Sequence, residues 1–200
     1  MTNQELIQKA NEFLTKYNSK KQIPVPIEEI VELSCNFKVI SAPGLKELLE
    51  TDSYICIDQR IIVIDDLIYR KYQSRSRFSY AHEIAHFCLH RDLEGFSQIT
   101  TRDDYKNFQI SISNEERKRI EYQAYRFAGY VLLPRDIFNN EVNKFIESFG
   151  GVSIMTLGDL AKMCPSLCEA FNVSELCLLK QLELEFPELI KQLKTDDRPC

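Results

Sequence analysis

The sequence predicts an α+β protein in which a small β-sheet packs against helices. Residues 53–64 hold two runs rich in β-branched residues, SYICI and RIIVI, which are typical of a β-hairpin. Residues 76–90 and 114–133 follow helical spacing, and a polar stretch separates them. We therefore expect a hairpin-containing sheet with two long helices packed near it.

The N-terminal elements are predicted from periodicity and from helix-breaking residues. An amphipathic helix is expected over residues 3–17, and Pro26 suits the first turn of a second helix, IEEIVELS. FKVIS resembles a short strand. Pro43 and Gly44 then break the chain before a short helix at LKELLE.

The second half of the chain is predicted to be helical after one polar loop. We expect a loop over residues 91–111, near the functional site. The long helix over 114–133 has Ser113 as its N-cap and ends before Pro134. Gly150-Gly151 is the expected hinge, and two or three short helices follow it. The predicted domains are therefore residues 1–150 and a helical subdomain over 151–200.

Composition and charge exclude several classes of protein. The 200 residues allow one sizeable core, and 44% apolar with 28% charged residues is ordinary for a globular protein. The net charge of −5 disfavours nucleic-acid binding, as do five Lys or Arg against eight Asp or Glu in residues 151–200. No apolar run is long enough to span a bilayer, and the polar N-terminus does not resemble a signal sequence. We expect a cytoplasmic protein without a membrane partner.

The seven cysteines are predicted to be reduced thiols, because their number is odd and their spacing irregular. The alternative is a second metal site formed by Cys164, Cys168 and Cys177. No CxxC pair supports that site, so buried core cysteines are the preferred interpretation.

Residues 82–86 read His82-Glu83-Ile84-Ala85-His86, an HExxH motif that uses two of only three histidines. Residues four apart share a helix face, so both imidazoles can reach one ion, while Glu83 can act as a base on a water molecule. The alternative is a pair of core histidines beside a chance glutamate. The helix is apolar nearly all round, and burying these polar groups without a partner would be costly. A metal site is therefore the preferred interpretation.

His90, the third histidine, lies two helical turns beyond His82, about 12 Å along the axis at 1.5 Å per residue. Zn–N bonds are about 2 Å long, so both residues cannot ligate one ion on an unbroken helix. The metzincin pattern also fails, because Leu89 stands where it needs glycine. His90 is expected to support a ligand or cap the helix end, with a plain surface histidine as the alternative.

A catalytic zinc site needs a third protein ligand, and with no histidine left we expect a carboxylate. Glu121 shares a helix face with the apolar residues Ala124, Tyr125, Ala128 and Leu132. A glutamate on such a face needs a partner, and the alanines would allow a close approach to the HExxH helix. The alternative is that Glu121 pairs with Arg117 or Arg126 on a solvated side.

Together these segments resemble the ImmA/IrrE family of metallo-endopeptidases. The resemblance rests on RFSYAHEIAHFCLH (77–90) followed by EYQAYRFAGYVLLP (121–134), and it covers roughly residues 5–150. It implies a zincin-like core with Zn²⁺ held by His82, His86 and Glu121, and with Glu83 as general base. The chain departs from the family pattern at Ala85, Tyr125 and Gly129 among others, and none of these three departures removes a ligand or the base.

The resemblance also implies a function. Members of the family typically cleave a helix-turn-helix repressor and so relieve transcriptional repression, in stress responses or in mobile elements. A hydrogen-bond donor must stabilise the negative charge that develops on the substrate carbonyl. The sequence leaves four candidates for it: Tyr80, Tyr122, Tyr125 and Arg126. The alternative function is a zinc-holding regulatory protein that binds a repressor or antitoxin-like partner without cutting it.

Overall fold

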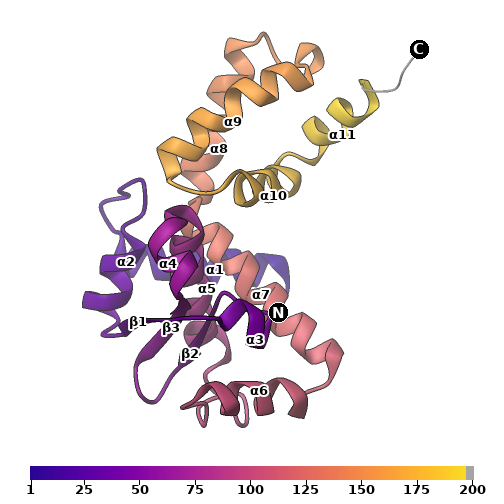
Figure 1. Ribbon diagram of the computed structural model, residues 1–200. Coiled ribbons are helices and arrows are strands. Elements are labelled where there is room, and N and C mark those ends of the chain that lie inside the picture. The colour runs from indigo at the N-terminus through magenta and orange to yellow at the C-terminus, as the bar shows by residue number, and fades with distance from the viewer. Residues whose placement is uncertain (197–200) are drawn as a thin grey trace. The chain divides into compact units, whose positions relative to one another are not determined.

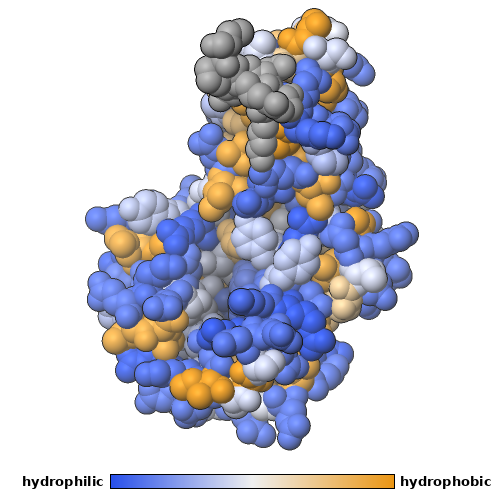
Figure 2. All heavy atoms as spheres, turned by 90° about the vertical axis from the view of Figure 1, so that its right-hand side faces the viewer, coloured by the Kyte–Doolittle hydropathy of each residue, from blue (hydrophilic) through white to orange (hydrophobic). Residues whose placement is uncertain are grey.

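The computed structural model describes residues 1–196, with side chains described to residue 193. The chain divides into two compact units, Met1–Leu132 and the residues from Leu133 onward. Helix α8, which the predicted division at residue 150 assigns to the first domain, lies in the second compact unit. Hydrophilic side chains predominate on the face shown in Figure 2, and hydrophobic side chains there lie in small separate groups.

The first unit is built from helices and a small sheet, so the α+β class is confirmed (Figure 1). Its elements, in chain order, are α1 (Asn3–Tyr17), α2 (Ile27–Glu29) with a π-helical turn (Ile30–Ser34), β1 (Lys38–Ala42), α3 (Leu45–Leu49), β2 (Ser53–Cys56), β3 (Ile61–Asp65), α4 (Asp66–Lys71), α5 (Gln73–His90), α6 (Arg102–Ser111) and α7 (Asn114–Leu132).

The three strands form one sheet in the order β1-β3-β2. Strands β2 and β3 are antiparallel and form the predicted hairpin, with Ile55 opposite Ile62. Strand β1 runs parallel to β3, with Ile40 opposite Val63. Every residue of β2 and most of β3 are buried, because α5 packs against both strands.

Helix α5 lies between the sheet and α7, its most extensive partner, and α1 packs against α7 in turn. Fully buried alanines occur on both helices of the central pair, among them Ala81 and Ala124, and small residues allow helix axes to approach closely. Phe127 of α7 lies edge-on to Phe13 of α1, with ring centroids 5.8 Å apart. This packing places the HExxH segment in the interior of the unit.

The predicted loop over residues 91–111 is wrong in its second half, which forms helix α6. Thr101 and Asp104 make a reciprocal capping box, in which each side chain accepts a hydrogen bond from the backbone N–H of the other. Tyr105 and Phe108, three residues apart, form the buried side of the helix. The polar composition of the segment hid both signals, because most other positions of α6 are exposed.

The second unit is helical, as predicted for the C-terminal region. Its elements are α8 (Arg135–Ser148), a 3₁₀ turn (Val152–Ile154), α9 (Leu157–Phe171), α10 (Glu175–Glu185) and α11 (Pro187–Asp196). Phe138 packs edge-on against Phe171 and Phe186, and Arg135 pairs with Glu185 at 2.6 Å. Gly151 has a φ of 106°, a conformation that favours glycine. The expected hinge at Gly150-Gly151 lies inside the second compact unit and stays a prediction.

All six cysteines in the described part of the chain are free thiols, and Cys200 lies outside it. No helix among the described residues is both long and apolar enough to cross a bilayer.

Candidate metal centre

Helix α5 places His82 and His86 on one face, one turn apart. The helix is buried along most of its length, and Ala81, Ile84 and Ala85 are fully buried around the two histidines. The Nε2 atoms of His82 and His86 lie 3.1 Å apart, so the two rings converge on one point instead of packing in parallel. His86 is 4% exposed.

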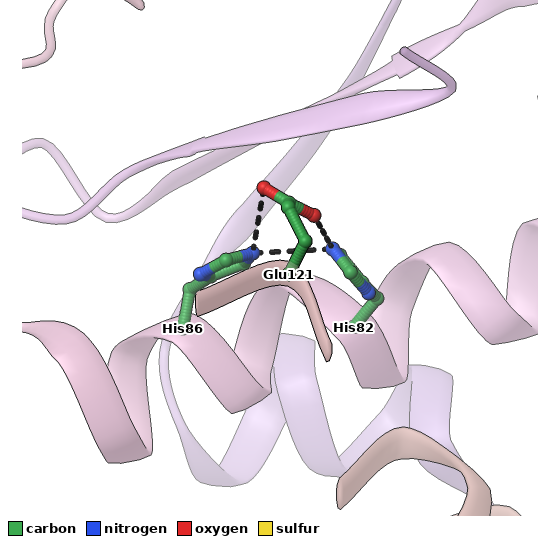
Figure 3. Close-up of side chains that lie close together, drawn as sticks. All are labelled: His82, His86 and Glu121. Atoms are coloured by element: carbon green, nitrogen blue, oxygen red, sulfur yellow. Dashed lines mark hydrogen bonds and ion pairs between the residues drawn. The ribbon is translucent and has the colours of Figure 1, made fainter. Parts of the chain in front are cut away.

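Glu121 reaches the same point from helix α7. Its Oε2 atom lies 3.1 Å from His82 Nε2, and its Oε1 atom lies 3.8 Å from His86 Nε2. Figure 3 shows the carboxylate set above both imidazoles, with one oxygen directed to each ring. The Glu121 side chain is 43% exposed, so the group opens to solvent on this side.

The two separations of 3.1 Å in this group are close to those between ligand atoms of a tetrahedral ion. Ligand atoms about 2 Å from a tetrahedral zinc lie roughly 3.3 Å from one another. The three side chains offer one ligand atom each within 4.8 Å of the others, and two imidazole nitrogens with a carboxylate oxygen suit zinc. Among the described residues this is the one such group of histidine, cysteine and acidic side chains. Cys164, Cys168 and Cys177 do not form a second.

The alternative partners of Glu121 are engaged elsewhere. Arg117 donates to Asn114 Oδ1, and Arg126 donates to Asn3 Oδ1. In the part of the chain that the structure describes, the ion-pair partners of Glu121 are His82 and His86. The glutamate therefore belongs to the histidine group and not to a solvated arginine pair.

The titratable groups of the site shift one another's pKa values. Burial lowers the pKa of His82, but the hydrogen bond and charge of Glu121 outweigh it, so the pKa lies above its usual range. The same contacts outweigh burial at Glu121 and lower its pKa to about 2. Burial is the main cause that holds the pKa of His86 well below its usual range, and the charge of the neighbouring His82 lowers it further. His86 is therefore neutral at pH 7, as a metal ligand must be.

Glu83 is a buried carboxyl group beside the two histidines, and it does not join the group that could hold a metal. It is 3% exposed, and its Oε1 atom accepts a hydrogen bond of 2.6 Å from Ser53 Oγ on strand β2. Burial raises its pKa to about 7. A carboxyl group with a pKa near neutrality can take up and release a proton at physiological pH.

A small cavity adjoins the site. Its volume is about 10 Å³, and Glu83, His86 and Glu121 contribute to its wall. Phe96, which stacks on the His86 ring at 5.4 Å, and Tyr105 of α6 lie among its other lining residues. A space of this size has room for about one water molecule. Sequence reasoning missed this wall because it placed α6 in a loop.

His90 lies against His86. The Nδ1 atoms of the two rings lie 3.1 Å apart, and His90 Nε2 lies 2.9 Å from Gln123 Oε1. Burial lowers the pKa of His90. Gln123 and Ser53 were not identified from the sequence, since their importance depends on contacts with residues about 30 positions away.

The four predicted hydrogen-bond donors lie apart from the cavity lining. Tyr80 donates to Glu32 at 2.9 Å, and Arg126 contacts Tyr130 as well as Asn3. Tyr122 is 55% exposed. The Tyr125 ring of α7 packs on Phe78, and the two ring centroids lie 5.0 Å apart. Phe78 is on α5, the same helix as His82. The stabilising donor therefore stays a prediction without an assigned residue.

Comparison with known families gives a match over most of the chain. The model of the M78 peptidase family, described as the IrrE N-terminal-like domain, matches residues 38–182, which is more than half of the chain. No curated protein sequence matches the chain. The matched region includes HExxH and Glu121. The family consists of metallopeptidases, in which the metal is commonly zinc. The chain belongs to the M78 (IrrE N-terminal-like) family of peptidases.

Proposed function

We propose that this protein is a zinc-dependent endopeptidase that cleaves a helix-turn-helix transcriptional repressor in the cytoplasm and so relieves repression. Family membership supports metallopeptidase activity. The observation that carries the proposal is the position of Glu83, a buried carboxyl group that accepts a hydrogen bond from Ser53 beside a His-His-Glu group. A purely structural metal site has no need of such a base.

The fold supports a zincin-like core, because the HExxH helix packs on the sheet and on the helix that carries Glu121. His82, His86 and Glu121 would hold the zinc ion. Bound there, zinc would lower the pKa of a water molecule and polarise the carbonyl of the scissile peptide bond.

Glu83 would handle the protons of the reaction. Its carboxylate accepts a proton from the attacking water, and the carboxylic acid then donates this proton to the nitrogen of the leaving amine. Ser53 holds Oε1 by a hydrogen bond, which leaves Oε2 for the water. The water-sized cavity against Glu83 and His86 supports this assignment. The hydrophobic residues that line this cavity would limit the access of other water molecules to Glu83.

The repressor as substrate and the role in stress responses or mobile elements follow from the resemblance to ImmA/IrrE proteins. A direct nucleic-acid contact is not expected from a chain with a net charge of −5. The regulatory role would therefore be exerted through the repressor and not through DNA.

The test is to purify the protein, measure its bound zinc by mass spectrometry, and incubate it with the helix-turn-helix protein encoded beside it. The wild type should bind about one zinc and cut the repressor at a defined site. Glu83→Gln should retain zinc and lose cleavage, whereas the control Glu115→Gln, at an exposed position of α7, should retain both. Cleavage by Glu83→Gln at the wild-type rate would contradict the mechanism.

The alternative is a regulatory protein that holds zinc and binds a repressor or antitoxin-like partner without cutting it. The same experiment distinguishes the two functions. Stable co-purification of the partner with wild type and with Glu83→Gln, and no cleavage by either, would favour the alternative.

A further inference from the structure

A chain of three buried side chains leads from helix α7 to the inner histidine of the metal centre. Gln123 Oε1 lies 2.9 Å from His90 Nε2, and His90 Nδ1 lies 3.1 Å from His86 Nδ1. The opposite nitrogen of His86, Nε2, lies 3.1 Å from His82 Nε2 and 3.8 Å from Glu121 Oε1. Each of the three residues is less than 7% exposed.

With the Gln123 amide oxygen facing His90, the hydrogen-bonding capacity of each group indicates where the protons of neutral rings lie. An amide oxygen only accepts, so His90 Nε2 must carry a proton that it donates to Gln123. A neutral imidazole carries one proton, which leaves Nδ1 of His90 as an acceptor. The 3.1 Å contact between the two Nδ1 atoms then requires that His86 Nδ1 be the donor. His86 Nε2 is left without a proton.

The reverse arrangement would spoil the metal centre. If His90 carried its proton on Nδ1, that proton would be donated to His86 Nδ1, and the His86 proton would move to Nε2. A protonated nitrogen has no lone pair for a metal. With Oε1 of Gln123 facing His90, an unprotonated Nε2 atom would set its lone pair against those of the oxygen, so this orientation of the amide disfavours the arrangement.

We propose that Gln123 is a positioning residue that selects, through His90, the tautomer of His86 whose Nε2 atom can bind the metal. The proposal rests on the proposed function only in taking His86 as a ligand. The common arrangement in metal sites is a ligating histidine held by a carboxylate or carbonyl group. Here a second histidine stands between the ligand and the carbonyl, because His90 lies one turn beyond His86 on the same helix.

Two variants separate the hydrogen-bond acceptor from the bulk of the side chain. Gln123→Met keeps the length and most of the volume but removes the accepting oxygen. Gln123→Glu keeps an acceptor at the same distance and should preserve the tautomer. Gln181→Met is a matched control, because Gln181 is also buried, at 4% exposed, and lies in the second compact unit.

The direct measurement is ¹⁵N NMR of the imidazole nitrogens in the metal-free protein at pH 7.5. The chain has only three histidines, so its spectrum contains three rings, which single His→Asn variants assign. In the wild type and in Gln123→Glu, His90 should be protonated at Nε2 and His86 at Nδ1. In Gln123→Met, both rings should show exchange between tautomers.

The second measurement is zinc affinity by competition with a chelator. Loss of a supporting partner of a ligating histidine typically weakens metal binding by about 10–100-fold. Gln123→Met should show a loss in this range, and Gln123→Glu and Gln181→Met should stay within about threefold of the wild type. Circular dichroism checks that each variant is folded.

The proposal is overturned if His86 of the wild type carries its proton on Nε2, a result that needs no variant to fold. It is also overturned if Gln123→Met keeps the wild-type tautomers and zinc affinity. Failure of the proposed function would look different, because a protein that binds no zinc or cuts no repressor could still show the predicted tautomers in its metal-free state.

Discussion

Replacing Glu83 by glutamine should stabilise the metal-free protein at alkaline pH while abolishing its activity. Glu83 is 3% exposed, and burial raises its pKa from 4.5 to about 7. One pKa unit corresponds to about 1.4 kcal/mol of free energy between the protonated and charged forms. The raised pKa therefore means that the charged carboxylate destabilises the folded state by about 3 kcal/mol. Glutamine has nearly the same shape, can accept the Ser53 hydrogen bond and carries no charge.

The sign of the pH dependence follows from proton binding. Below pH 4.5 the carboxyl group is protonated in both states, and Glu83 has no effect on the pH dependence of stability. Between pH 4.5 and about 7 the folded state keeps a proton that the unfolded state has released, so stability falls as pH rises. Above pH 7 the full cost of about 3 kcal/mol is present.

The assay is urea denaturation of chelator-treated wild type and Glu83→Gln at pH 5 and at pH 8, followed by circular dichroism. The difference in unfolding free energy should be below about 1 kcal/mol at pH 5 and about 3 kcal/mol in favour of the variant at pH 8. Both proteins contain the same second unit, so it cancels in the comparison. A difference that is equal at the two pH values, or a variant that is less stable at pH 8, would refute the reasoning.

Other changes should act on metal binding, catalysis and the core separately. Glu121→Ala removes a proposed ligand and should weaken zinc binding more than about 100-fold in chelator competition, beyond the loss expected for a supporting residue. The control Glu115→Ala should leave zinc affinity unchanged. Equal zinc affinities of the two variants would contradict the assignment of Glu121 as a ligand. Ser53→Ala should lower the cleavage rate about 10–100-fold at unchanged zinc affinity, because hydrogen bonds to charged groups contribute about 1.5–3 kcal/mol. Unchanged cleavage would show that Ser53 does not orient Glu83. Phe127→Ala should cost about 3–5 kcal/mol of unfolding free energy, because the ring is fully buried. Saturating zinc should raise the melting temperature of the wild type and not of Glu121→Ala, as expected when a ligand binds only the folded state.

Local patterns predicted most of the first unit. The 3–17 helix, the 53–64 hairpin and the two long helices all form within a few residues of the predicted bounds. The apolar periodicity of these segments matches the faces that they bury, so sequence and packing agree. Helix α6 was missed, since a capping box and two aromatic side chains give too few apolar positions to stand out in a polar segment.

The residues of the candidate site also fall into two groups, those that local sequence patterns predict and those that only tertiary packing brings to the site. The two histidines and Glu83 follow from helix geometry, and Glu121 from the conflict between its charge and its apolar face. Ser53 and Gln123 carry no local signal, because serine in a strand and glutamine in a helix are common. Their partners lie 30 and 33 residues away, and only the packing of α5 on β2 and α7 brings them together.

A comparison of two buried carboxyl groups in the first unit, Asp65 and Glu83, supports a functional role for Glu83. Asp65 is 5% exposed and accepts hydrogen bonds from four backbone N–H groups at the starts of α3 and α4, which accounts fully for its burial. Among the described residues Glu83 accepts one hydrogen bond, from Ser53, and burial leaves its pKa near neutrality. A destabilising group that packing does not require is expected where activity needs it. The expected stability cost of Glu83 and its position beside the His-His-Glu group therefore support the same proposed role, that of a general base.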